Sequence, residues 1–317
     1  MEYPINERRL PADISHLEIE MRDVPTETWG VYSFGILPGY ENNLLETHPQ
    51  GYFGDMILET PQDRLTAVVR NESEEDLTFI LKLFYNYQEV AFKIVGDEDY
   101  RTEFIFTIDS GWEFNIPFHL HSSIERNDFL NKLTAGIFLN PEGHAHWEQH
   151  LESSFALMLN YEISFGGQER ITLTGKPAVP IKEIDSLRYT GVMVNQDFNP
   201  FAVGARRPPT LLQAASGEVI EFAFVASAYG IIIEQVENYL FIVMVDWHQT
   251  LLDDAPYLWL ESDGEDRGQH GSFTITAPLE PGLYEVVAFF IPNPTRPASM
   301  ENYFPLQIST RFTLEIR

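Results

Sequence analysis

The feature that most constrains the fold of this chain is a hydrophobic pattern with a period of two. Short apolar runs, broken by Gly, Pro, Asn and Asp, recur roughly every ten residues, and stretches with a sustained helical period are rare. In the segment 102–108, Phe104, Phe106 and Ile108 alternate with Glu103, Ile105 and Thr107. Since successive side chains of a strand point to opposite faces, this segment predicts a strand with one apolar face. The sequence therefore predicts an all-β fold.

The same pattern predicts strands along most of the chain. The expected ranges are 65–70, 77–87, 89–95, 102–108, 112–120, 133–139, 155–165, 169–174, 187–195, 217–226, 239–247, 257–260, 271–276, 283–291 and 306–316. The first two flank the charged segment 71–76 and are expected to pair as a hairpin with a long polar tip. The last alternates without a break from Arg311 to Arg317, which predicts a half-exposed final strand.

One or two short helices are expected within the first half. Ser122 to Glu125 has the spacing of a capping box, and apolar residues follow at helical intervals up to Leu133. A second short helix is expected over residues 142–153.

Two domains are the expected organisation, because 317 residues is about twice the usual length of one domain. Pro177 and Pro180 lie in a segment that suits an extended connector. We expect an N-terminal β-sandwich domain over residues 1–175, a linker over 176–186 and a C-terminal β-sandwich domain over 187–317. The halves have similar numbers of predicted strands, which leaves open whether they are diverged copies of one architecture.

Charge and cysteine content limit the classes of partner and compartment. The chain has 20 Lys and Arg against 48 Asp and Glu, a net charge of −28, which disfavours nucleic acid and anionic membrane surfaces. It has no cysteine, which excludes disulfides, thiolate zinc sites and cysteine nucleophiles. A cysteine-free, β-rich chain is expected of a protein exported by a bacterium that does not build disulfides.

Membrane insertion of this chain is not expected. It has no run of 18 apolar residues, and its first seven residues lack the basic and apolar regions of a signal peptide. The leader or anchor of an exported protein would therefore lie outside this sequence.

Three features of the second half match one group of β-sandwich domains. Residues 217–224 resemble the second strand of these domains, the run ending in Trp247 resembles their strand with a core tryptophan, and Tyr284 resembles the tyrosine at the corner between their two sheets. The second half therefore resembles the immunoglobulin-like and fibronectin-like sandwiches of bacterial surface proteins, which implies an immunoglobulin-like β-sandwich for the C-terminal domain. Val286 stands where antibody domains have a cysteine. The resemblance implies a spacer, adhesion or accessory role without naming a ligand.

Five of the nine histidines form the one cluster that resembles a metal site. They are His119, His121, His144, His146 and His150. His119 and His121 would share a strand face, and His146 and His150 would share a helix face. A divalent metal is one interpretation, with Glu142 or Glu148 as the nearest carboxylate. The other is that strand edges and a polar loop are simply rich in histidine.

Three tryptophans are candidates for a sugar-binding platform: Trp112, Trp147 and Trp259. The competing interpretation places them in the core, where aromatic residues of β-sandwiches usually lie. No nucleophile elbow, P-loop or dinucleotide-binding glycine pattern occurs in the chain.

These observations favour a non-enzymatic, extracellular or cell-surface module of a bacterial protein. Its expected partner is a protein or carbohydrate at the cell surface, with no nucleic acid and no cofactor. The alternatives are a carbohydrate-binding accessory module and a metal-binding protein or metalloenzyme that uses the histidines of the first half.

Overall fold

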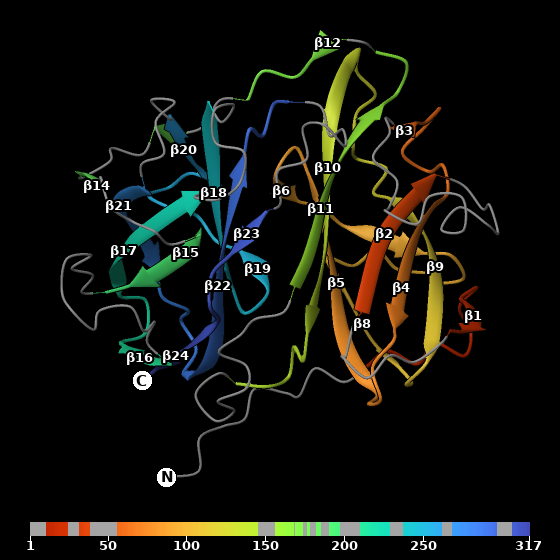
Figure 1. The fold of residues 1–317 in the computed structure, drawn as a ribbon, viewed down its shortest axis with the longest axis horizontal. Coiled ribbons are helices and arrows are strands. Elements are labelled where there is room, and N and C mark those ends of the chain that lie inside the picture. Colours follow the sequence, from red (N-terminus) through yellow and green to blue (C-terminus); the bar gives the residue numbers. More distant parts are fainter. Residues whose placement is uncertain are drawn as a thin grey trace.

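In a computed structural model, the described part of the chain folds into β-strands arranged in four sheets (Figure 1). The structure describes residues 11–24, 32–38, 56–144, 156–167, 169–173, 176–177, 182–184, 190–196, 210–228, 237–261, 268–296 and 306–317. The elements found in these residues are all strands, which confirms the all-β prediction, and the described residues contain no helix. None of their elements is a helix long and apolar enough to cross a membrane.

The first half contributes two sheets, which we call A and B. Sheet A has the order β1 (Glu20–Asp23), β9 (Trp112–Leu120), β4 (Leu65–Asn71), β2 (Tyr32–Pro38), and β7 (Phe92–Ile94) also pairs with β9. Sheet B has the order β3 (Met56–Ile57), β11 (Ala156–Ser164), β10 (Phe129–Leu139), β5 (Leu77–Tyr85), β6 (Gln88–Glu89), with β8 (Glu103–Ile108) on β5 and β12 (Glu169–Arg170) on β10.

The second half contributes sheets C and D. Sheet C has the order β13 (Lys176–Pro177), β20 (Leu258–Glu261), β18 (Asn238–Val245), β22 (Gly282–Pro292), β24 (Phe312–Ile316), β16 (Leu211–Ala214), with β19 (His248–Gln249) on β18 and β23 (Gln307–Ile308) on β22. Sheet D has the order β14 (Lys182–Ile184), β21 (Gly268–Thr276), β17 (Val219–Ala228), β15 (Thr190–Asn195).

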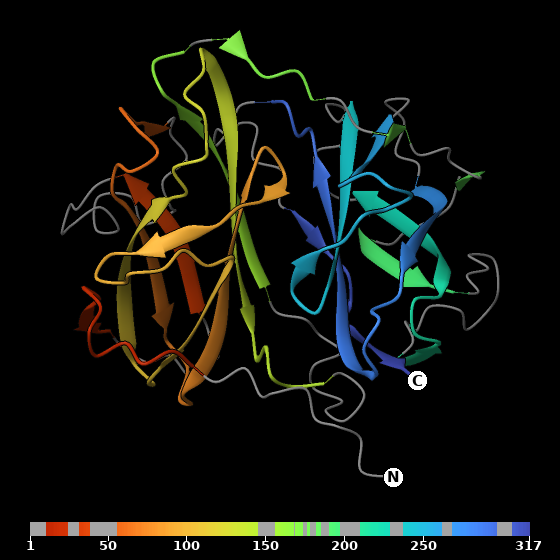
Figure 2. The ribbon, with the colours of Figure 1, turned by 180° about the vertical axis from the view of Figure 1, so that it is seen from behind.

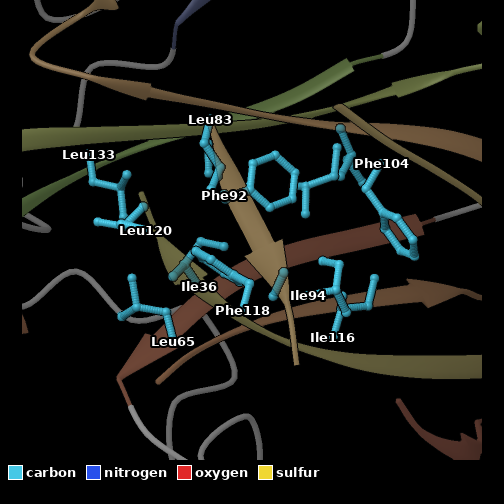
Figure 3. Packing of buried hydrophobic residues seen from close by; sticks show 14 of the residues in the cluster. Ile36, Leu65, Leu83, Phe92, Ile94, Phe104, Ile116, Phe118, Leu120 and Leu133 are labelled. Carbon is cyan, nitrogen blue, oxygen red and sulfur yellow. The ribbon is translucent and has the colours of Figure 1, made fainter. Parts of the chain in front are cut away.

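The four sheets form four layers in the order A, B, C, D (Figures 1 and 2). One apolar cluster fills the space between sheets A and B, where Phe104, Ile116 and Phe118 meet (Figure 3). A second cluster fills the space between sheets C and D. A third joins sheets B and C, with Phe84 and Phe138 on one side and Phe289 on the other. We call this contact the B–C interface.

The two halves repeat one strand order. In sheets B and C, the order β8-β5-β10-β11-β3 matches β20-β18-β22-β24-β16, and the final pair of each series is parallel. In sheets A and D, β1-β9-β4-β2 matches β14-β21-β17-β15, and all these pairs are antiparallel. The sequence left this repeat open, and the fold contains it.

The expected helix at Ser122–Leu133 is wrong. Residues 122–128 form turns and bends, and β10 begins at Phe129. Leu133, Ala135 and Ile137 point into the cluster between sheets A and B, and Phe138 points into the B–C interface. Because both faces of sheet B are covered, its strands are apolar on both sides, which hides the period of two. Most of the second expected helix, 142–153, lies outside the described residues, and Glu142 to His144 form no helix.

The expected hairpin between 65–70 and 77–87 is also wrong. β4 lies in sheet A and β5 in sheet B, so the segment between them crosses from one sheet to the other. Asn71 anchors this crossing, since its fully buried side chain donates hydrogen bonds to Glu75 O at 2.7 Å and to Ile108 O at 3.0 Å. The charged residues of the segment correctly predicted a turn, but they could not indicate that the chain crosses there to the other sheet.

The final strand is buried rather than half-exposed. β24 lies between β22 and β16, and Arg311, Thr313 and Glu315 are at most 3% exposed. Their polar groups are paired: Thr313 Oγ1 donates to Glu285 Oε1 at 2.6 Å, and Gln213 Nε2 donates to Glu315 Oε2 at 2.7 Å. Alternation marked the two faces correctly but could not indicate that the polar face has internal partners.

The predicted corner of the second half is confirmed. The chain leaves β21 in sheet D and enters β22 in sheet C through residues 277–281. The Tyr284 hydroxyl donates a hydrogen bond to Glu280 O at 2.8 Å, which closes the corner.

Candidate functional site

His119 and His121 lie together at one end of β9. His119 is opposite Lys93 in the β7–β9 pair, and its buried Nδ1 has no hydrogen-bond partner among the described residues. The Nδ1 of His121 lies 2.6 Å from Ser123 Oγ and accepts the Ser123 backbone N–H at 3.1 Å. The Tyr100 ring packs edge-on against His121, with centroids 4.5 Å apart. The structure thus brings these two predicted residues to one place.

His144 lies in a different environment from His119 and His121, the other two described histidines of the predicted cluster. Its Nδ1 is 3.1 Å from Glu285 Oε1 on β22 in sheet C, whereas His119 lies on β9 in sheet A and His121 directly follows that strand. His146 and His150 lie outside the described residues. Within the part of the chain that the structure describes, no three His, Asp or Glu side chains form a group that could hold a metal ion. A site formed by all five histidines stays a prediction.

The predicted tryptophans do not share one surface where they are described. Trp112 begins β9 and packs, half-buried, against the cluster between sheets A and B. Trp259 in β20 packs, half-buried, against the B–C interface. Trp147 lies outside the described residues. A platform of all three stays a prediction.

The most extensive polar arrangement in the described residues lies at the B–C interface and begins with two matching hairpins. β5 turns into β6 through Asn86 and Tyr87, and β18 turns into β19 through Asp246 and Trp247. Their φ angles are 50° and 64° in the first turn and 51° and 67° in the second, as in type I′ hairpins. Asn and Asp tolerate this conformation, whereas the bulky Tyr and Trp adopt it only where their surroundings hold them there.

Tyr87 and Trp247 each donate a hydrogen bond to the opposite half of the molecule. The Tyr87 hydroxyl donates to Pro294 O at 2.7 Å, and the Trp247 Nε1–H donates to Pro141 O at 3.1 Å. Asn160 Nδ2 completes the environment of the Tyr87 hydroxyl at 2.8 Å. Both side chains are at most 2% exposed, and burial raises the pKa of Tyr87 above its ordinary value. Trp247, expected at a strand end as a core residue, therefore lies in a turn and fills the interface.

The two acceptor carbonyls belong to matching Asn-Pro turns. Asn140 and Asn293 have φ angles of 48° and 46°. Each accepts the backbone N–H of the third residue after it, Gly143 at 3.2 Å and Arg296 at 3.0 Å. The turns therefore present the same backbone surface to opposite partners.

A buried cation from the opposite half binds each turn. Lys132 Nζ donates to Arg296 O, and Arg311 NH2 donates to Gly143 O at 2.6 Å. Each cation also has a buried carboxylate partner: Lys132 Nζ lies 3.0 Å from Glu162 Oε1, and Arg311 Nε lies 2.8 Å from Glu285 Oε2. Pairing and hydrogen bonding offset the cost of burying these charges.

Glu89 and Gln249 connect the two hairpins directly. The Glu89 N–H donates to Gln249 Oε1 at 2.7 Å, and the Gln249 N–H donates to Glu89 Oε2 at 3.3 Å. Gln249 Nε2 also donates to Tyr87 O at 2.9 Å and to Pro256 O at 2.8 Å. The two hairpins are thereby fixed in register.

A charged cluster surrounds Glu89. The fully buried Lys82 Nζ pairs with Glu89 and lies 3.8 Å from Glu103 Oε2. His248, from the other half, lies 3.4 Å from Glu89 Oε1 and 3.8 Å from Glu103 Oε2. Burial by itself raises the pKa of Glu89, but the His248 hydrogen bond and the Lys82 charge together hold it below its ordinary value. The positive charge of Lys82 thus offsets the negative charge of these carboxylates, and the hydrogen bond between His248 and Glu89 connects the two halves.

Sequence reasoning missed this interface. Its signals were the buried polar residues Lys82, Lys132 and Glu162 within apolar strands, and the Asn-Pro dipeptides at 140 and 293. Each signal is common in other proteins, and only the repeated strand order shows that the two Asn-Pro dipeptides hold equivalent positions, after β10 and after β22.

Comparison with known proteins leaves the family open. No protein-family profile and no curated protein sequence matches the chain. Red sea bream transglutaminase is 10% identical, with a TM-score of 0.24 over 92% of this chain and 32% of the other. The C-terminal domain of the antigen I/II polypeptide BspA of Streptococcus agalactiae is 9% identical, with a TM-score of 0.25 over 89% of this chain and 100% of that one.

A CARDB domain from Pyrococcus furiosus, in complex with di-metal ions, is 11% identical and has a TM-score of 0.25, over 40% of this chain and 86% of the other. These TM-scores are too low to carry a functional argument, so the function of this chain is inferred from its own residues.

Proposed function

We propose that this chain is a non-enzymatic, extracytoplasmic module of a bacterial surface or secreted protein, in which two β-sandwich units act as one rigid body. The units correspond to residues 1–175 and 187–317, joined by 176–186. Their partner is a protein or carbohydrate at the cell surface.

The observation that carries this proposal is the reciprocal hydrogen bonding at the B–C interface. Tyr87 binds Pro294 O, and Trp247 binds Pro141 O. Contacts between units of one chain that are small and polar permit relative motion, whereas an apolar interface with satisfied buried polar groups restrains it. A module that holds its ends at a fixed separation and orientation suits a spacer or a ligand-presenting unit.

Composition supports the compartment. The chain has no cysteine and carries a net charge of −28, so it needs no disulfide exchange and resists self-association. The strong charge also disfavours polyanionic partners.

Surface labelling of intact cells tests the proposed location. Antibodies raised against the folded chain should label non-permeabilised cells of the encoding organism, and brief protease treatment of those cells should remove the signal. Labelling that appears only after permeabilisation would contradict the proposal. A cytoplasmic protein in the same cells serves as the control for integrity.

A further inference from the structure

A cationic and aromatic cluster lies at one end of sheet A, well apart from the B–C interface. It consists of Lys93, Tyr100, His119 and His121, and we call it the β7–β9 cluster. Lys93 is opposite His119 in the strand pair. Lys93 Nζ lies 5.3 Å from the centroid of the Tyr100 ring, and His121 packs on the same ring. Lys93 and His121 therefore both contact the Tyr100 ring, and His119 lies opposite Lys93 in the strand pair.

The cluster contains a cation that is not neutralised by the described residues. Lys93 contacts the Tyr100 ring and has no ion-pair partner within the described ranges. The nearby acid Asp97 is already paired with Arg101.

His119 adds an unsatisfied polar atom. Its Nδ1 is buried and has no hydrogen-bond partner in the part of the chain that the structure describes. Leaving a buried polar atom unpaired costs free energy, and native proteins rarely do so without a reason. A rotation of the imidazole toward a bound acceptor would satisfy this atom.

The charge of the β7–β9 cluster favours an anion over a metal ion as its ligand. Lys93 lies opposite His119 in the β7–β9 pair, so its positive charge disfavours a cation bound at His119. The described residues also supply no group of three metal ligands. An oxyanion, in contrast, accepts hydrogen bonds from both an ammonium and an imidazole N–H, and such charge-assisted bonds are the strong ones.

We propose that the β7–β9 cluster binds a small oxyanion, a carboxylate or sulfate group, through Lys93 and His119, with His121 and Tyr100 forming its wall. The net charge of −28 repels a polyanion, so the ligand bears its charge on a single group. This site is independent of the rigid-body role proposed above.

Imidazole NMR of the full chain tests the proposal. Sodium sulfate and sodium glucuronate, titrated separately at constant ionic strength, are the probes. Selective and saturable shifts of the His119 and His121 resonances are expected, with the resonances assigned from H119Q and H121Q. The two salts show whether a sulfate or a carboxylate fits.

Two charge-matched variants complete the test. Lys93→Gln should weaken binding by about tenfold or more, because it removes a charge-assisted hydrogen bond. Arg317→Gln removes the same charge from an exposed side chain of the other half and should leave binding unchanged. Equal shifts in both variants, shifts spread over all histidines, or no shift with either salt would overturn the proposal. Saturable zinc binding at His119 and His121 without an anion effect would overturn it in favour of the metal interpretation.

Discussion

Glu89 and Gln249 hold equivalent positions in the two interface hairpins, and the side chain of each accepts the backbone N–H of the other, at 2.7 and 3.3 Å. The two halves are therefore related by an approximate two-fold axis, which passes close to this pair. The same relationship matches Tyr87 with Trp247 and exchanges their hydrogen-bond acceptors. The chain thus resembles a symmetric dimer whose two subunits are joined covalently.

The Glu89–Gln249 exchange predicts a loss of stability when its stronger acceptor is removed. Gln249→Ala should destabilise the protein by about 1–3 kcal/mol, because the backbone N–H of Glu89 then loses its acceptor. Urea unfolding of the variant and the parent at neutral pH measures the loss. A variant as stable as the parent would show that the exchange does not stabilise the protein.

Tyr87→Phe should destabilise the protein by about 1–3 kcal/mol, because Pro294 O and the Asn160 amide lose a buried partner. Tyr284→Phe is the matched control, since it removes a hydroxyl that bonds Glu280 O at an exposed corner, and it should have a smaller effect. The shift of the urea midpoint, at an unchanged slope, reports both values. Equal effects would contradict a special role for Tyr87.

Arg311→Met should destabilise by about 3–5 kcal/mol, because it leaves the Glu285 carboxylate buried without its principal cation. Adding Glu285→Gln in the same chain should restore part of this loss, since the uncompensated charge is removed. Thermal unfolding compares the single and double variants. A double variant less stable than Arg311→Met alone would contradict this explanation.

The charge of Glu89 predicts a pH dependence. Its pKa is lower in the folded chain than in the unfolded one, so the unfolded chain binds more protons between these two values. The resulting stabilisation is complete above the unfolded pKa of about 4.3 and is lost as the pH falls through the folded pKa. In Glu89→Gln, stability should therefore fall less steeply on the acid side than in the parent.

Urea midpoints measured at several pH values between about 6 and 3 test this difference. Glu98→Gln, in an exposed turn, changes the net charge equally and controls for the overall charge. If the stability of Glu89→Gln and of Glu98→Gln falls equally steeply as the pH is lowered, the charged cluster around Glu89 does not cause the pH dependence.

Most strands could be predicted from the sequence, because strands that combine an apolar face with a polar face keep their alternation. The range expected for β9, 112–120, is the observed one. The corner at Tyr284 was also predictable, since it depends on a local turn and one hydrogen bond. Errors fell where burial on both faces removed the period of two, as in β10, and where a polar face met internal partners, as in β24.

The candidate sites were less predictable for a physical reason. Spacing along a strand placed His119 and His121 together, but Lys93 lies opposite His119 only through a strand pairing that spacing does not reveal. The interface residues come from both halves, and the pairing of Tyr87 with Pro294 spans most of the chain. No local pattern encodes such a contact.

Calorimetric unfolding of the whole chain tests most directly whether the two halves form one rigid unit. Because the B–C interface satisfies buried groups from both halves, neither half should unfold alone. We predict a single transition whose calorimetric enthalpy equals its van't Hoff enthalpy. Two resolved transitions, or a calorimetric enthalpy about twice the van't Hoff value, would show that the halves unfold independently and would contradict a single rigid unit.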